Sequence, residues 1–132
     1  MPIIEFSERD IKRGIIVTPA WYRMRIDEVG EKLSKDGRST NYVVDGTILK
    51  NADDGTEQFA GVPVSWNFNS KAPGFMVGYF QSFGQEVTAG SRFELGNTIA
   101  KELDVYVEND TYENRLINRV NHKYRVPKTV AA

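Results

Sequence analysis

The feature that most constrains the fold of this chain is an alternation of apolar and polar side chains with a period of two residues. It is clearest from Trp21 to Val29, where Tyr22, Met24 and Ile26 share one parity. Successive side chains of a strand point to opposite faces of a sheet, so this period is typical of a half-buried strand. The same alternation, or a run rich in Val, Ile and aromatic residues, predicts strands at residues 21–29, 41–49, 59–68, 103–108 and 115–125.

One segment between the third and fourth of these strands has a helical period instead. Met76, Tyr79, Phe80 and Phe83 recur at helical spacing, and a glycine follows the last of them. We expect this helix to plug the bottom of a barrel with its apolar stripe. A shorter helical piece is predicted near residues 97–101.

Three strands, a helix and two strands, in that order, predict an all-β protein with one main helix. The expected fold class is the OB fold, a five-stranded Greek-key barrel with its helix between strands three and four. Residues 18–126 form this domain, and residues 127–132 form a C-terminal tail. Residues 1–17 form an N-terminal arm or a short extra strand, and the arm is the segment we expect to contact a second copy of the chain.

Composition excludes several classes of function. The chain of 132 residues has no cysteine and a single histidine, His122, which rules out thiolate chemistry, disulfides and multi-histidine metal sites. Asp53 and Asp54 are adjacent on a turn but have no third ligand at a known spacing, and Asp27 and Asp45 have no feature of an acid–base pair. We therefore expect a protein that is not an enzyme and that has no metal or cofactor.

The charge and hydropathy of the chain bear on its partners and location. No apolar run approaches the roughly 20 residues needed to cross a bilayer, and the first residues contain no signal peptide. The sequence therefore predicts a cytoplasmic protein with no membrane partner. The formal net charge of −1 argues against indiscriminate binding of polyanions, so the placement of the 17 Lys and Arg residues is decisive.

Several stretches resemble a known family. They are residues 18–26 (TPAWYRMRI), 70–75 (SKAPGF), 101–107 (KELDVYV), 112–115 (YENR) and 118–120 (NRV). Over about residues 15–126 the chain resembles phage-encoded OB-fold single-stranded DNA-binding proteins. The resemblance implies a role in viral DNA replication or recombination, in the cytoplasm of a host cell. Many such proteins recruit partners with an acidic tail; residues 128–132 (KTVAA) are not acidic, so recruitment of that kind is not expected.

The clearest positive element is the predicted fifth strand. Arg115, Arg119, Lys123 and Arg125 share one parity and hence one face, and no acid of this strand accompanies them. Proteins that bind single strands combine such a stripe with aromatic faces on which bases stack. The alternative is an edge strand that charge protects against unwanted pairing, and the sequence leaves both interpretations open.

Two further groups of cations lie near the start of the domain. They are Arg23 and Arg25, which share the polar side of the first strand with Trp21, and Lys32, Lys35 and Arg38 in the loop after it. A Trp beside two Arg suits stacking with phosphate contact, and OB folds often bind ligands at that loop. The alternatives are a Trp that closes the end of the barrel and an ordinary solvated hairpin.

The aromatic side chains divide by parity. Tyr106 has the parity opposite to its apolar neighbours and Tyr112 lies in the last turn, so we expect both to be accessible to bases. Trp66 and Phe68 share the parity of an apolar run, which predicts burial. His122 is expected to be a partly buried histidine rather than a general base.

These features predict sequence-nonspecific binding of single-stranded DNA in a groove formed by the first strand, the basic loop and the fifth strand. RNA is left open as a ligand, since only a contact to the 2′-hydroxyl distinguishes the two. The alternative function is a protein–protein interaction module or virion component, which the near-neutral charge favours. An oligosaccharide binder would need exposed aromatic rings without the basic stripe.

Overall fold

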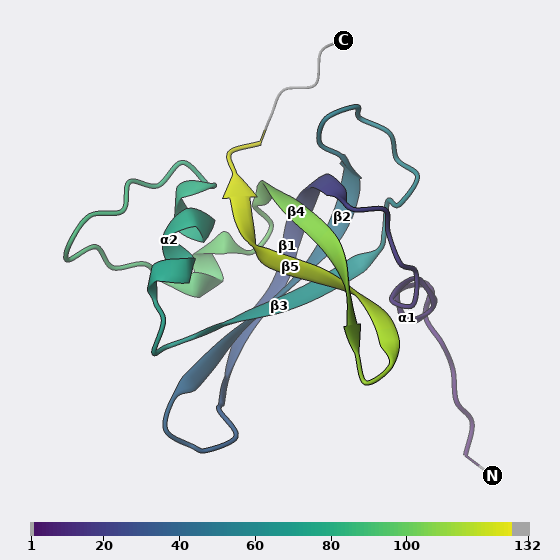
Figure 1. The fold of residues 1–132 in the computed structure, drawn as a ribbon, viewed down its shortest axis with the longest axis horizontal. Coiled ribbons are helices and arrows are strands. Elements are labelled where there is room, and N and C mark those ends of the chain that lie inside the picture. The colour runs from purple at the N-terminus through teal and green to yellow at the C-terminus, as the bar shows by residue number, and fades with distance from the viewer. Residues whose placement is uncertain (1, 128–132) are drawn as a thin grey trace.

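The computed structural model describes residues 2–127, in which two helices, one short 3-10 helix and five strands follow one another along the chain (Figure 1). The elements are α1 (Glu8–Lys12), β1 (Ala20–Leu33), β2 (Thr40–Asn51), β3 (Pro63–Asn69), α2 (Gly74–Gln81), the 3-10 helix η1 (Leu95–Thr98), β4 (Glu102–Tyr112) and β5 (Arg115–Arg125). The prediction of a mainly β chain with five strands is confirmed. The first and second strands run further than predicted and form a long hairpin, and the third begins later, at Pro63.

The five strands form one antiparallel sheet in the order β3-β2-β1-β4-β5. Its two edges, β3 and β5, are not hydrogen-bonded neighbours, so the sheet does not close into the predicted five-stranded barrel. The sheet nevertheless coils until its edges approach across the core, where the ring centroids of Trp66 and Tyr124 are 6.3 Å apart. Register shifts in β1, between Arg23 and Met24 and between Ile26 and Glu28, contribute to this coiling, because bulges increase local twist.

The inward-facing residues of the strands form the core. Met24, Ile26, Ile48, Leu103 and Val105 have no exposed surface. Burial of each such side chain contributes roughly 1.5–3 kcal/mol. The parity argument for the third strand is also confirmed, because Trp66 is 7% exposed and Phe68 is 2% exposed.

Helix α2 packs part of its apolar stripe against the core. Tyr79 is fully buried and its hydroxyl donates to Oγ1 of Thr98, 3.0 Å away. Phe80 is buried as well, and Met76 and Phe83 are partly buried against the core. The second short helical segment is η1, which lies slightly earlier in the chain than predicted.

The arm differs from the prediction, because it contains the helix α1 and its residues 15–17 form no strand. A capping box between Ser7 and Asp10 stabilises this helix, which is too short to give a periodic signal. The arm is also bound to the sheet. Val17 is buried, its backbone N–H donates to Oδ1 of Asn118 over 3.0 Å, and Nδ2 of Asn118 donates to the carbonyl of Ile15 over 2.8 Å.

Two predictions concern the ends of the chain and membranes. Of the predicted tail, 127–132, all but Pro127 lies outside the described residues. Within residues 2–127, no helix has the length and apolar character that a membrane crossing requires.

Candidate nucleic-acid interface

Strands β1, β4 and β5 present many of the predicted site residues on one side of the sheet, which we call the outer face. In the register of these strands Trp21 lies opposite Tyr106, and Arg23 lies opposite Asp104. Asp104 in turn lies opposite Arg125. The cations of β1 and β5 therefore meet over β4, as the parity of each strand indicates.

Three arginines of the outer face, Arg23, Arg119 and Arg125, are paired with acids, which contradicts the expected acid-free stripe. Asp104 is fully buried and accepts from Nε of Arg23 at 2.7 Å, and Nε of Arg125 lies 3.4 Å from its other oxygen. Arg119 pairs with Asp110 at 2.9 Å. The reason is that the parity of β5 describes only β5, whereas the acids come from the neighbouring strand β4.

One more of the predicted cations has an acidic partner, and one already described has a second. Nε of Arg25 lies 2.9 Å from Oδ1 of Asp27. Arg125 makes a second ion pair, at 2.7 Å, with Asp53 in the turn after β2. Each phosphate contact by these side chains would therefore have to compete with a carboxylate that is already in place.

The aromatic rings of the outer face are covered by cations. Trp21 and Tyr106 meet edge to face with centroids 5.6 Å apart. The guanidinium of Arg125 lies 4.2 Å from the centroid of Trp21, and Nζ of Lys123 lies 5.1 Å from that of Tyr106. Such contacts contribute about 0.5–2 kcal/mol each, so a base would have to displace a cation in order to stack here.

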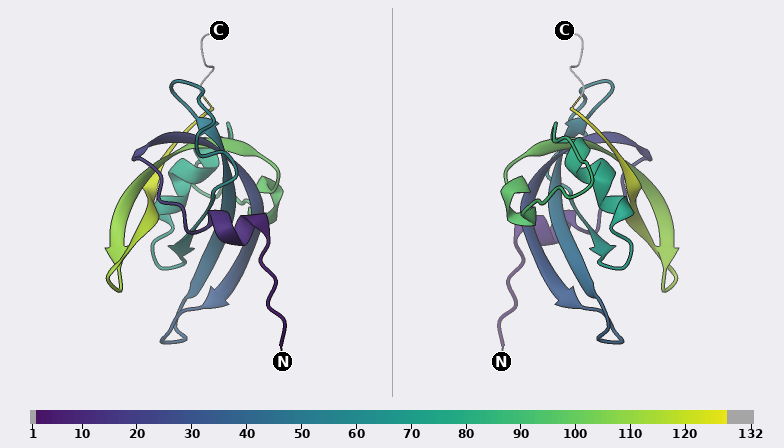
Figure 2. Two further views of the ribbon diagram at one scale, coloured as in Figure 1. Left: turned by 90° about the vertical axis from the view of Figure 1, so that its right-hand side faces the viewer. Right: turned by 90° about the vertical axis from the view of Figure 1, so that its left-hand side faces the viewer.

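The hairpin tips differ, because their cations have no acidic partner among residues 2–127. Lys32, Lys35 and Arg38 of the β1–β2 hairpin and Arg115 of the β4–β5 hairpin are exposed, and within residues 2–127 none of them forms an ion pair. Tyr112, beside Arg115, is 54% exposed. The two hairpins extend toward the same end of the molecule (Figures 1 and 2).

A groove of about 350 Å³ separates the two edges of the sheet, and we call it the edge groove. Its walls are Ser65, Trp66 and Asn67 of β3 and residues 117–122 of β5. Asn67 and Asn121 are exposed there and offer amide donors and acceptors. This groove was not predicted from the sequence. Its signal was the presence of several asparagines in strands, where asparagine is normally disfavoured.

An exposed ring lies beside the edge groove. Phe75, at the start of α2, is 56% exposed and packs on His122 with centroids 4.8 Å apart and ring planes 30° apart. His122 has a positive φ of 55° and contacts the hydroxyl of Tyr124 through Nδ1 at 3.1 Å. Burial lowers the pKa of His122, so this ring is neutral near pH 7. The ring of Phe75 is exposed and can offer a surface on which a base stacks.

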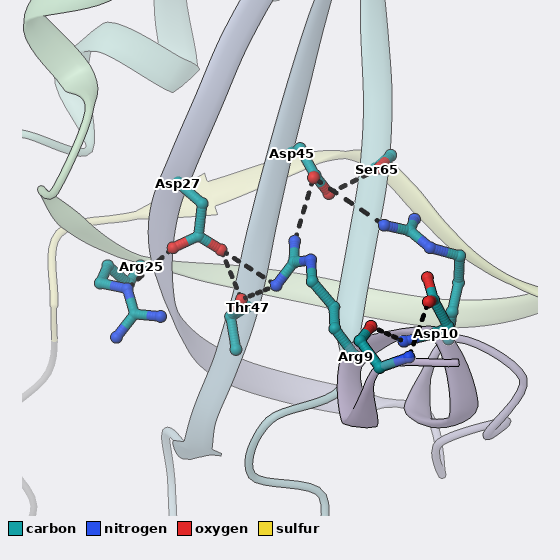
Figure 3. Close-up of polar contacts among 9 residues, drawn as sticks. Arg9, Asp10, Arg25, Asp27, Asp45, Thr47 and Ser65 are labelled. Carbon is teal, nitrogen blue, oxygen red and sulfur yellow. Dashed lines mark hydrogen bonds and ion pairs between the residues drawn. The ribbon is translucent and has the colours of Figure 1, made fainter. Parts of the chain in front are cut away.

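Helix α1 of the arm contacts the outward side of β1 and β2 through Arg9 (Figure 3). Arg9 of α1 donates to Thr47 at 2.6 Å, and it pairs with Asp45 at 3.0 Å and Asp27 at 3.4 Å. Burial alone would raise the pKa of Asp27, but hydrogen bonds from Thr47 and Arg25, with the charges of Arg25 and Arg9, hold it below the ordinary value. Both carboxylates are thus held by cations.

Within residues 2–127, no three acidic or histidine side chains come together in a way that could hold a metal ion.

The sequence matches no known protein-family model, and no curated protein matches it.

Proposed function

We propose that this chain is a non-enzymatic OB-type protein that binds single-stranded DNA without sequence preference, in phage-type replication or recombination. One observation carries the proposal: cations that have no acidic partner in the described part of the chain lie on two hairpins that extend to the same end of the molecule, with the edge groove between the edge strands. Single-stranded RNA has the same phosphates and base faces, so it is the second ligand to test.

The topology supports an OB-type fold. In the sheet, β1 lies between β2 and β4, while β3 and β5 are the edges that approach each other. An OB barrel opened between its third and fifth strands has this order, and OB folds include partly open barrels whose ligands bind at the loops after the first and fourth strands. Those loops are here the tips that carry Arg38 and Arg115.

The chemistry of the surface suits a strand without sequence readout. Lys32, Lys35, Arg38 and Arg115 contact phosphates, and the ring of Phe75 and the amides of the edge groove face the bases. Stacking contributes roughly 1–3 kcal/mol per base and is indifferent to base identity. The cations of the outer face serve mainly to hold β1, β4 and β5 together, which differs from the groove expected from the sequence.

The test is a fluorescence titration of the full chain with dT oligomers, followed by tryptophan emission, since Trp66 lines the edge groove. We expect quenching at micromolar DNA and low salt that weakens as salt is added, because bound phosphates release counterions. Parallel titrations with rU oligomers compare RNA. Unchanged emission and unchanged anisotropy of a labelled dT oligomer at low salt would overturn the proposal.

A second candidate, a protein–protein interaction module or virion component, has its own observation. The strand cations are paired with acids, and large apolar side chains such as Ile3, Phe6 and Phe75 are exposed. This function is the better one if the titration shows no binding of either nucleic acid.

A further inference from the structure

The first residues of the arm form an apolar segment that makes little contact with the rest of the chain. Ile3 is 94% exposed, Ile4 is 75% exposed and Phe6 is 71% exposed. They precede α1, which is held to the sheet through Arg9, so the segment starts from a fixed point and extends away from the body (Figure 1). Exposed apolar clusters of this kind mark surfaces that bind another protein.

A second apolar surface surrounds α2, and we call it the α2 surface. A hollow of about 320 Å³ is lined by Tyr42, Pro73, Met76, Phe80, Phe93 and Leu95. Phe80 and Phe93 stack with centroids 4.7 Å apart and form its wall. Phe93 is itself 36% exposed, so an incoming apolar side chain can contact it without any rearrangement of the core.

The charged residues beside the α2 surface indicate which segment it binds. A neighbouring hollow shares Phe80 and Phe93 and is also lined by two cations, Arg92 and Lys101, and one acid, Glu94. Neither cation forms an ion pair within residues 2–127, so the hollow has a net positive charge. The arm segment carries one acid, Glu5, between Ile4 and Phe6. In an extended segment, side chains alternate in direction, so Ile4 and Phe6 can enter the apolar hollow while Glu5 faces the cations.

The arm and the α2 surface lie on opposite sides of the same molecule (Figures 1 and 2). The two views of Figure 2 look at the molecule from opposite sides, with α1 nearest the viewer in one and α2 in the other. Arg9 and Val17 fix the base of the arm on its own side. The complementary surfaces therefore belong to two molecules.

We propose that the arm segment of one molecule, residues 3–6, binds the α2 surface of a second copy. Such a contact joins two different surfaces, so it is head to tail and leaves one free arm and one free α2 surface on every assembly. Copies can therefore add in a row. The contact does not depend on DNA binding, and it is tested without DNA.

The first experiment uses sedimentation velocity of the full chain over a range of concentrations. We expect mass to rise with concentration, and each of Ile4→Asp and Phe93→Asp to weaken association roughly 10- to 100-fold, the loss of one buried apolar contact. Leu116→Asp, at a side chain that is 60% exposed on the β4–β5 hairpin, is the matched control. A wild-type chain that stays monomeric at every concentration would overturn the proposal.

The head-to-tail geometry gives a sharper result when variants are mixed. The Ile4→Asp chain keeps an intact α2 surface and the Phe93→Asp chain keeps an intact arm, so the mixture should form dimers of one copy of each and nothing larger. Failure of the mixture to associate, when the wild type does associate, would contradict the assigned contact.

The absence of cysteine from the sequence allows a direct check. An Ile4→Cys chain mixed with a Phe93→Cys chain under oxidised glutathione should form a disulfide-linked heterodimer much faster than Ile4→Cys mixed with Leu116→Cys. Equal rates for the two mixtures would show that the arm does not bind at α2.

Discussion

The outer face and the hairpin tips contain similar numbers of cations but use them differently. On the outer face, Arg23, Arg119 and Arg125 are paired with aspartates of β4. At the tips, Lys35 and Arg115 have no acidic partner within the described chain, residues 2–127. A basic residue is therefore informative about ligand binding only when its cross-strand neighbours are known.

The largest expected effect is on stability and comes from the centre of the outer face. Asp104→Ala leaves Arg23, whose side chain is 12% exposed, without its buried carboxylate. We expect the free energy of unfolding in urea to fall by about 3–5 kcal/mol. Asp110→Ala is the control, because that pair is half-exposed and should contribute less than about 1 kcal/mol. Equal losses in the two variants would remove the distinction between a structural pair and a surface pair.

The next effect is on DNA affinity and comes from the edge groove. Phe75→Ala should weaken binding of a dT oligomer by about 1–3 kcal/mol, the contribution of one stacked base. Its stability should change little, since the ring is 56% exposed. Leu116→Ala, which truncates a similarly exposed side chain, is the control, and a matching loss of affinity there would exclude a specific role for Phe75.

A smaller effect concerns pH and the wall of the same groove. Burial lowers the pKa of His122 below its ordinary value of 6.5. Below about pH 6.5 the unfolded chain then binds more protons at His122 than the folded chain does. The free energy of unfolding therefore keeps the full contribution of neutral His122 above pH 6.5 and decreases as the pH falls below that value. His122→Asn, a residue that tolerates positive φ, should reduce the loss of stability in urea between pH 7 and about pH 5. Parallel curves for the two chains would contradict this assignment.

The smallest effect is expected on the outer face. Arg25→Ala removes a cation whose charge is already met by Asp27. We expect the affinity for dT oligomers to change by less than about twofold, which corresponds to a few tenths of a kcal/mol. A tenfold loss in the same fluorescence titration would place Arg25 in the binding surface.

Much of the fold follows from local patterns in the sequence. The alternation with a period of two residues identified the strands and predicted the burial of Trp66 and Phe68. A core on one face of a sheet imposes this period on each strand independently of the other strands. Helical spacing likewise identified α2, whose Tyr79 and Phe80 are buried. Helix α1 was missed because a single turn has no period; its signal was the capping box between Ser7 and Asp10.

The site was harder to predict because it depends on relations between strands. Arg119 and Arg125 looked unopposed until β4 placed Asp110 and Asp104 beside them. The edge groove depends on the sheet remaining open and on an irregularity in β5 near His122, which has a positive φ. Neither feature is encoded in the period of one strand.

The most direct test of the account compares the salt dependence of dT binding in three chains. They are the wild type, a hairpin variant (Lys32→Ala, Lys35→Ala and Arg38→Ala) and an outer-face variant (Arg25→Ala and Lys123→Ala). If the hairpin cations contact phosphates, the slope of log affinity against log salt becomes shallower by roughly 2 in the hairpin variant, or about 0.7 per contact. The outer-face variant should keep the wild-type slope, and the reverse result would contradict the account.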